Sequence, residues 1–278
     1  QIDSEAIIET MREPIPIKLG NYMWTFTDYA EILNGVKSIY YAKMTKYIAE
    51  GEVPQLDHET NTTSYSITPD MIEASSPFVY VPEYSGIGYL QIWNKIEERT
   101  FRSRFSKLVE EKRRGFFVDC KLEPISDIKT FLDKIIMLDS VERMYAKVNP
   151  PNPSFGHLWK ELDEYMRTRN TDEVTIEEKS ETKIQTNLQI YVQLIADGAN
   201  LQDEVKTPPP IGDAAILMAA DGYGNGKIEG ESNGFKTVIN TADNAVVIKL
   251  PPDIDPEPLH AEIYRKLEEI SGQRYMGH

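Results

Sequence analysis

The chain has 278 residues, enough for one large domain or two smaller ones, and its 40% hydrophobic content is typical of a globular protein. Its formal net charge of −15 argues against a general nucleic-acid-binding protein. No apolar run is long enough for a helical membrane span, and the N-terminus lacks the apolar segment of a secretory signal. The single cysteine, Cys120, excludes an internal disulfide and predicts a cytoplasmic location.

Residues 1–93 form a β-rich N-terminal region in this interpretation. Three segments rich in β-branched and aromatic residues, within 36–53, 64–68 and 76–93, predict strands separated by turns. The polar segment LDHETNTTS at 56–64 predicts a loop between two of them. Before these strands, TFTDYAEILNG predicts a short helix that begins at Thr27 and ends at Gly35.

Residues 94–183 predict a second region, composed of a basic helix and a ferredoxin-like βαβ domain. Phe101, Phe105 and Leu108 recur at helical spacing within 94–114, and Gly115 ends that helix. A strand at 116–124, a helix at 126–138 and a strand at 141–151 then follow, which is the order of a βαβ unit. A further helix at 155–170 and a strand at 172–180 complete the predicted α+β fold.

Residues 184–278 predict a C-terminal α/β region. Helices are expected at 183–204 and 213–222, and Asn233-Gly234 predicts a two-residue β-hairpin turn. A third strand is expected in AVVIKLPP at 245–252, and the chain closes with an amphipathic helix near 256–271.

Three segments in fixed order give the chain a resemblance to a known family. They are the basic-aromatic helix at 99–107, the EPISD segment at 123–127 and NPPNP at 149–153, with ADGYGNGKIEG at 220–230 as a further element. Across roughly residues 90–170 the chain resembles a little-characterised family of bacterial and phage proteins that includes relatives of the phage-exclusion protein RexA. The resemblance implies a role in phage exclusion or defence, with nucleic-acid contact. It supplies no catalytic motif.

The basic helix is the main candidate site. From Arg99 to Arg114 seven basic residues face two acids, a local charge of +5, so the rest of the chain carries −20. Cations on one helix face suit a phosphate backbone, because each neutralised phosphate releases counterions. The alternative is a solvated helix face whose arginines pair with neighbouring acids. The predicted contacts with DNA, RNA or an acidic partner are Arg99, Arg102, Arg104, Lys107, Arg113 and Arg114.

Other chemistry has weaker signals. Asp119 and Lys121 match part of a Mg²⁺-dependent nuclease motif, but no convincing second acid accompanies them, so a solvated strand face is the favoured explanation. ADGYGNGKIEG resembles a calcium loop, yet Tyr223 and Ser232 stand where oxygen ligands are required, so a helix-to-strand turn is favoured. His58, His157, His260 and His278 are scattered, and no metal or other cofactor is expected.

The sequence therefore predicts a non-enzymatic antiviral defence factor that binds nucleic acid or a protein partner through the helix at 99–114. An alternative is an oligomeric assembly module that uses edge strands or the last helix. A third hypothesis is the nuclease with Asp119 and Lys121. No membrane partner is expected.

Overall fold

The computed structural model describes residues 4–34, 37–114, 119–151, 158–251 and 254–275. The chain divides into two compact units: residues 1–121 with 252–264, and residues 122–251 with 265–278. Each contains one antiparallel sheet and several helices, so the predicted α+β class is confirmed. The boundaries expected after residues 93 and 183 both lie inside units. Within the described ranges, no helix is long and apolar enough to cross a membrane.

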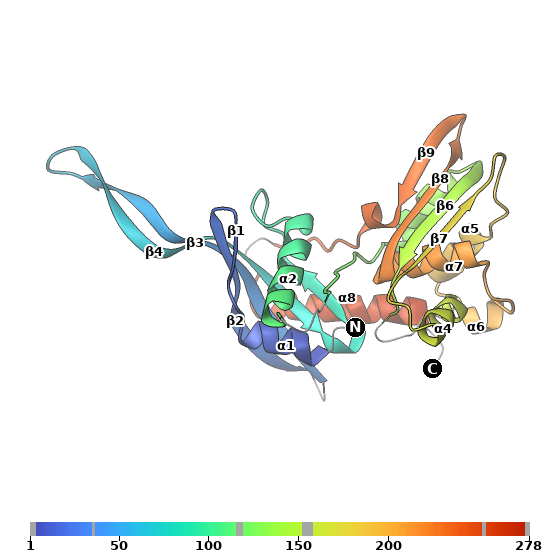
Figure 1. Ribbon diagram of the computed structural model, residues 1–278, viewed down its shortest axis with the longest axis horizontal. Helices are drawn as coiled ribbons and strands as arrows, with labels where there is room; N and C mark the ends of the chain where they lie inside the picture. The colour runs from blue at the N-terminus through green and yellow to red at the C-terminus, as the bar shows by residue number, and fades with distance from the viewer. Residues whose placement is uncertain (1–3, 35–36, 115–118, 152–157, 252–253, 276–278) are drawn as a thin grey trace. The chain divides into compact units, whose positions relative to one another are not determined.

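The first unit is built on a five-stranded sheet in the order β1-β2-β3-β4-β5, with every neighbouring pair antiparallel (Figure 1). Its strands are β1 (Ile17–Leu19), β2 (Tyr22–Asn34), β3 (Lys37–Asp57), β4 (Thr62–Val81) and β5 (Gly86–Tyr89). Strand order follows chain order, so each strand turns back beside the one before it. A short 3-10 helix, η1 (Pro82–Tyr84), connects the last two strands.

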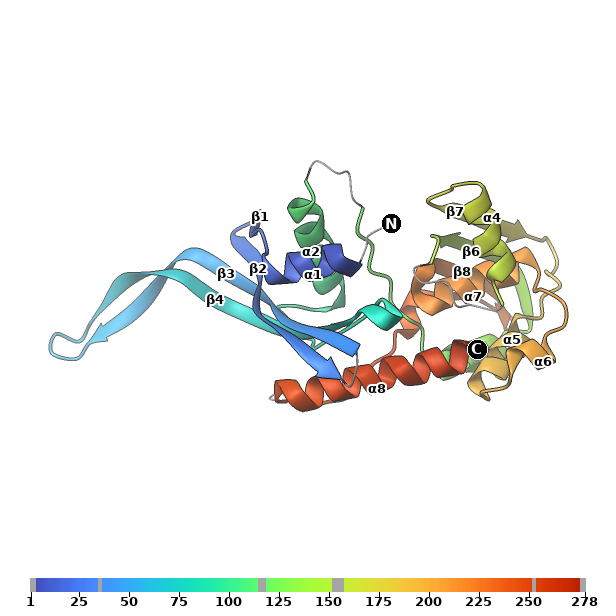
Figure 2. The ribbon, with the colours of Figure 1, turned by 90° about the horizontal axis from the view of Figure 1, so that it is seen from below.

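Helices cover both faces of this sheet near its centre (Figure 2). On one face lie α1 (Ser4–Arg12) and α2 (Glu98–Lys112). The buried rings of α2 contact the sheet, since Phe105 lies 5.4 Å from Phe26 and 5.7 Å from Phe78 between ring centroids. On the other face lies the first part of α8 (Pro256–Tyr275), whose Ile263 packs so closely on Gly88 that a Cβ there would lie 2.6 Å from it. The predicted helix at 94–114 is thereby confirmed.

The helix expected at 25–35 is wrong, because residues 25–34 belong to β2, and Gly35, its expected end, lies outside the described residues. Trp24 and Phe26 alternate with half-buried residues and bury their rings beneath α2, a period of two that a helix would not satisfy. Asp28 has φ 55° at the irregularity between Thr27 and Ala30, so the polar residues that suggested a helix start form a β-bulge instead.

Strands β3 and β4 extend well past the rest of the sheet as a two-stranded hairpin (Figure 1). Tyr47 is the last β3 residue paired with β2, through Met23, whereas the β3–β4 ladder continues to Asp57 and Thr62. We call residues 48–71 the arm. At about 3.4 Å per residue, the ten residues from 48 to 57 span about 34 Å. The polar loop expected at 56–64 is the tip of this arm.

The second unit contains a four-stranded antiparallel sheet in the order β7-β6-β8-β9. Its strands are β6 (Ser140–Val148), β7 (Val174–Lys179), β8 (Gly224–Ser232) and β9 (Phe235–Asn240). The helices are α3 (Ile128–Ile136), α4 (Lys160–Thr168), α5 (Leu188–Ala196), α6 (Leu201–Glu204) and α7 (Ile211–Met218). In Figure 1, α5 and α7 lie behind one face of this sheet. Met144, Ala146 and Ile228 point to that side, into a core shared with Phe131 and Leu217.

The ferredoxin-like arrangement is not confirmed. Residues 119–125 have no strand structure, so α3 does not connect two strands as the βαβ unit requires. Both neighbours of β6 run antiparallel to it. The strand expected in AVVIKLPP is also wrong, because of its residues only Ala245 makes a bridge, to Ser126, and Val247 is exposed. In both segments apolar residues suggested a strand, but no sheet edge lies beside them to complete the backbone hydrogen bonds.

The glycine-rich stretch at 220–230 is the helix-to-strand turn that the sequence favoured. A π-helical segment, η2 (Ala219–Tyr223), leads from α7 directly into β8. Gly224 lies so close to β6 that a Cβ would approach the Lys147 carbonyl oxygen to 2.1 Å. The Asn233-Gly234 turn is confirmed, with φ 51° and 78°, between Ser232 and its partner Phe235.

Candidate functional site

The predicted basic residues on and just after α2 divide into paired and unpaired groups. Three of the six form ion pairs: Arg102 with Glu98, Arg114 with Glu111, and Arg113 with Glu9 of α1. The neighbouring Lys112, which is not one of the six, pairs with Glu13. The fourth interaction, Lys112–Glu13, has a distance of 3.4 Å and adds a second link between α2 and the segment after α1.

Three of the six predicted residues are thus paired, and the remaining three are Arg99, Arg104 and Lys107. None of these three forms an ion pair within the part of the chain that the structure describes. Arg99 and Lys107 are exposed, whereas Arg104 is half-buried. Part of the basic helix therefore fits the interpretation as a helix with internal ion pairs. The three remaining cations are still available for contact with a partner.

Arg104 occupies an unusual position for a cation. Its guanidinium carbon lies 5.3 Å from the ring centroid of the buried Trp24, and burial lowers its pKa from the ordinary arginine value. Neither Nε of Arg104 nor Nε1 of Trp24 has a hydrogen-bond partner among the described residues. A guanidinium without a carboxylate beside it leaves hydrogen-bonding capacity for an incoming anion.

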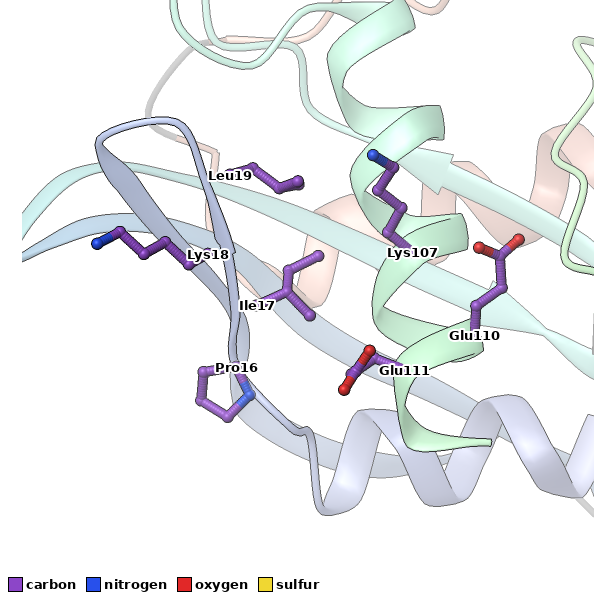
Figure 3. Close-up of a pocket in the computed structure, with 7 residues that line it drawn as sticks. All are labelled: Pro16, Ile17, Lys18, Leu19, Lys107, Glu110 and Glu111. Atoms are coloured by element: carbon purple, nitrogen blue, oxygen red, sulfur yellow. The ribbon is translucent and has the colours of Figure 1, made fainter. Parts of the chain in front are cut away.

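A pocket of about 380 Å³ lies between β1 and α2, lined by Pro16, Ile17, Lys18, Leu19, Lys107, Glu110 and Glu111. Figure 3 shows Ile17 and Leu19 pointing from β1 toward the helix, while Lys18 points to the opposite side of the strand. Of the two acids, Glu110 accepts a hydrogen bond from the Cys120 backbone N–H and Glu111 pairs with Arg114. The two lining lysines, Lys18 and Lys107, form no ion pair among the described residues, and Lys107 is the one that lies on α2.

The arm is the second candidate surface. Cross-strand partners share one face of a ribbon, and so do residues two apart on a strand. The pairs Glu52–Ile67, Pro54–Tyr65 and Leu56–Thr63 therefore place the apolar side chains of the outer arm together. Leu56, Tyr65 and Ile67 are 58%, 67% and 71% exposed. We call the set Pro54, Leu56, Tyr65 and Ile67 the apolar arm face.

On the opposite arm face, the two pairs nearest the tip, Gln55–Ser64 and Asp57–Thr62, are polar. The tip is held by local hydrogen bonds, since the Asp57 carboxylate accepts from the backbone N–H groups of Glu59 and Thr60. Pro54 and Pro69 lie on the two strands, and a proline offers no N–H to an added strand. Contact through the side chains of the apolar arm face is the mode of binding that remains.

The charge of the arm is one-sided. No lysine or arginine occurs between Lys46 and Lys95. The acids in that interval are Glu50, Glu52, Asp57, Glu59, Asp70, Glu73 and Glu83. An arm of this charge repels a nucleic-acid backbone and attracts a cationic protein surface.

The nuclease candidates do not assemble a site. Asp119 and Lys121 lie in a segment without strand structure, and their side chains pair with each other at 3.3 Å while staying exposed. Cys120 between them is buried, and burial raises the pKa of its thiol to about 12. In the described residues, no group of three histidine, cysteine or acidic side chains is placed to hold a metal ion.

The other motif residues have structural partners or cannot be placed. Asp221, position 1 of the calcium-like loop, accepts a hydrogen bond of 2.8 Å from the indole of Trp159. Tyr223 packs edge-on against the same ring, 5.3 Å between centroids. His157 lies outside the described residues, as does part of NPPNP. The turn therefore serves to anchor Trp159 in the second unit.

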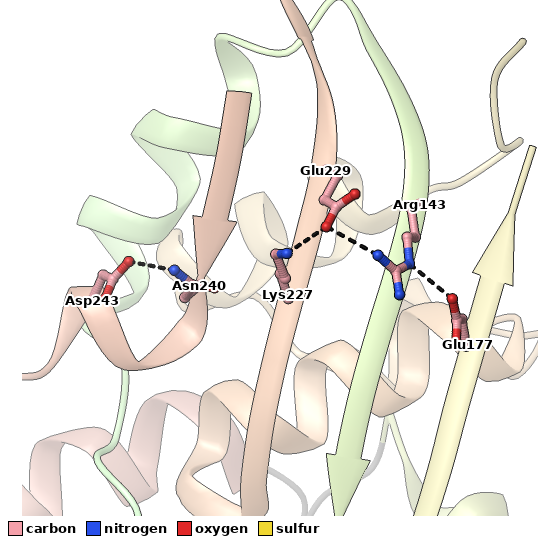
Figure 4. A network of polar contacts seen from close by, with 6 residues as sticks. All are labelled: Arg143, Glu177, Lys227, Glu229, Asn240 and Asp243. Carbon is pink, nitrogen blue, oxygen red and sulfur yellow. Dashed lines mark hydrogen bonds and ion pairs between the residues drawn. The ribbon is translucent and has the colours of Figure 1, made fainter. Parts of the chain in front are cut away.

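The uncovered face of the second sheet carries a network of ion pairs (Figure 4). Arg143 of β6 donates to Glu177 of β7 at 2.8 Å and to Glu229 of β8 at 3.2 Å, and Lys227 also pairs with Glu229. Beside them, Asn240 donates to Asp243. These charges compensate one another, which is the usual composition of a solvated sheet face.

Comparison with known proteins places the chain in a family. A family model described as a domain of unknown function (DUF4747) matches residues 5–205, which is more than half of the chain. The chain belongs to the DUF4747 family. No curated protein and no solved structure matches it. The matched segment of this DUF4747 protein includes the arm and α2, but the family description names no activity, and the expected relation to phage-exclusion proteins stays a prediction.

Sequence reasoning found α2 and missed the arm as a surface. The signal was present: the alternating residues 52–56 and 63–67 flank a polar turn, and the first segment contains Pro54, which is unusual for a strand inside a sheet. These two segments are recognised as an arm only when the backbone pairing between them is known, because the sequence does not show that the rest of the sheet ends before them.

Proposed function

We propose that this DUF4747 protein is a protein-binding assembly factor that docks through the arm of its first unit. The observation that carries the proposal is the apolar arm face, where Leu56, Tyr65 and Ile67 are exposed side by side on a ribbon. Contiguous apolar side chains of this size on a projecting element are typical of protein interfaces. The two prolines and the acids of the arm support the same proposal, because they oppose strand addition and nucleic-acid contact.

Binding of nucleic acid through α2 receives less support. Arg102 and Arg113 are engaged with carboxylates, and Arg104 is half-buried against Trp24. A phosphate-binding helix needs several free cations on one side. We therefore treat the unpaired α2 cations as part of a protein interface.

The experiment compares native complexes of the tagged wild-type protein with those of a Tyr65→Ser/Ile67→Ser variant. We expect the wild type to migrate above its monomer mass of 31.8 kDa in lysate from its native host and the variant to lose that complex. The matched control is Gln55→Ser/Ser64→Ala, a cross-strand pair on the opposite arm face. Complexes that are the same for all three proteins would refute the proposal.

A further inference from the structure

We infer that the partner of the arm is the arm of a second copy of this chain, packed antiparallel so that each tip reaches the β1–α2 pocket of the other copy. This inference rests on the proposed function and specifies its partner. Three features of the first unit support it. They are the sheet face to which the apolar arm face and the pocket belong, the position of the pocket at the base of the arm, and the charges at the tip and the base.

The apolar arm face continues, by strand alternation, the sheet face on which the pocket lies. Ile17 of the pocket pairs with Trp24, which shares a sheet face with Phe26 beneath α2. Phe26 pairs with Met44, and every second β3 residue from Met44 leads outward to Leu56 on the apolar arm face. Both surfaces therefore belong to one face of the ladder that runs from the sheet into the arm, and in the proposed dimer the two copies meet through this face.

The pocket also lies at the base of the arm. Lys18 of β1 pairs with Met23, and Met23 pairs with Tyr47, the point at which β3 leaves its β2 partner. A second arm of equal length, laid antiparallel on the first, brings its tip to this base. The same relation holds in the other direction, so the contact is two-fold symmetric and closes as a dimer.

The charges of tip and base are complementary in this arrangement. Asp57 and Glu59 lie at the tip, whereas Lys46, Arg104 and Lys107 lie at the base or beside the pocket. Arg104 and Lys107 have no ion pair within the described structure. A carboxylate from the partner's tip would supply the ion pair that Arg104, whose Nη1 donates to Ser103 Oγ, does not form among the described residues.

A second copy is favoured over an unrelated basic protein because both halves of the contact are present on this chain. The arm supplies an acidic, apolar rod, and the base supplies an apolar pocket flanked by cations. The cations and the apolar residues Ile17 and Leu19 lie on neighbouring elements, β1 and α2, as a docking surface for such a rod requires.

The first experiment is site-directed cross-linking between two differently tagged copies in a Cys120→Ala background, which removes the single native cysteine. One copy carries Leu56→Cys on the apolar arm face, and the other carries Leu19→Cys in the pocket. We expect a mixed disulfide after mild oxidation, at least tenfold more than with Gln55→Cys on the opposite arm face. Equal yields from Leu56→Cys and Gln55→Cys would overturn the antiparallel arrangement.

The second experiment needs no cysteine substitution. Light scattering of the purified wild-type chain is expected to give twice the monomer mass, and Tyr65→Ser/Ile67→Ser is expected to give the monomer mass, with Gln55→Ser/Ser64→Ala as the control. Circular dichroism of each variant confirms that it is folded. A purified monomer at all concentrations, with arm-dependent complexes still present in the lysate, would overturn the second copy as partner and leave the proposed function standing. Complexes that do not depend on the arm would refute both the proposed function and the second copy as the partner.

Discussion

Cys120 is held in an environment that suppresses its chemistry. It is buried, and burial raises the pKa of its thiol to about 12, although a hydrogen bond with Ser106 lowers it. Because the thiolate is the reactive form, the folded protein is expected to resist alkylation at pH 8. Labelling with iodoacetamide should be at least a hundredfold slower in buffer than in 6 M urea, as measured by mass spectrometry. Equal rates in both solvents would contradict the burial.

Asp213 is a buried acid whose protonation should affect stability. Burial raises its pKa above the ordinary 3.8, opposed by hydrogen bonds from Thr186 and the Asn187 backbone. An acid with a raised native pKa binds its proton more tightly when folded, so its contribution to stability is lost as the pH rises from 3.8 through the native pKa. The free energy of unfolding of the wild type, minus that of Asp213→Asn, should therefore be larger at pH 4 than at pH 7. Urea denaturation at both values measures this difference, and a larger difference at pH 7 would contradict it.

Gly230 and Gly272 make a matched pair of glycines with opposite expectations. A Cβ at Gly230 would lie 2.1 Å from the Ser140 carbonyl oxygen, whereas nothing lies within 4 Å of one at Gly272 in α8. Gly230→Ala should lower the free energy of unfolding by about 2 kcal/mol or more, because backbone must move. Gly272→Ala should raise it by about 0.5–1 kcal/mol, since a helical glycine costs conformational entropy. Denaturant titrations of both variants decide the matter, and equal effects would show that the close contact is absent.

At the scale of elements, the arm carries its own expectation. In the proposed antiparallel dimer the two-fold axis would pass near mid-arm, where the Glu52 carboxylates of the two copies would approach each other. Replacing Glu52 by glutamine removes this repulsion, and like-charge pairs across strands cost about 0.2–1 kcal/mol. Glu52→Gln should therefore tighten the dimer, as measured by analytical ultracentrifugation. Glu83→Gln, which removes an acid that pairs with Lys37 outside the arm, should have no such effect.

The elements that the sequence predicted correctly are those whose signals are local. The α2 stripe of Phe101, Phe105 and Leu108 is set by helical periodicity, and the Asn233-Gly234 turn by its positive φ angles. The segment at 25–35 failed because Thr27 and Asp28 suit a helix start, and only pairing with β3 makes them a bulge. For α2 as a site, the sequence predicted the cations but not their ion pairs with Glu9 and Glu13, which come from the separate helix α1 and the residue beyond it.

At the scale of the whole molecule, two separate cores should respond separately to mutation. Phe131 is fully buried in the core that contains Trp159, whereas Trp24 lies in the other unit. Phe131→Ala should cost about 3–5 kcal/mol, the usual range for a buried phenylalanine. In single-tryptophan variants, the Trp159 fluorescence transition in urea should move to lower concentration by more than the Trp24 transition. Equal shifts would show that the chain unfolds as one cooperative unit.

The closed hydrogen bonding of the arm tip has a consequence for how such proteins change over time. The carboxylate of Asp57 accepts hydrogen bonds from the backbone N–H groups of Glu59 and Thr60, so these contacts of the tip are local and do not involve the core beneath α2. Residues 58–60 can therefore vary, and the turn can lengthen or accept an inserted peptide, while the fold is preserved; Asn61, at φ 52°, needs a residue that tolerates a left-handed backbone. Proteins that share this scaffold can therefore acquire different binding partners through a few substitutions at the tip.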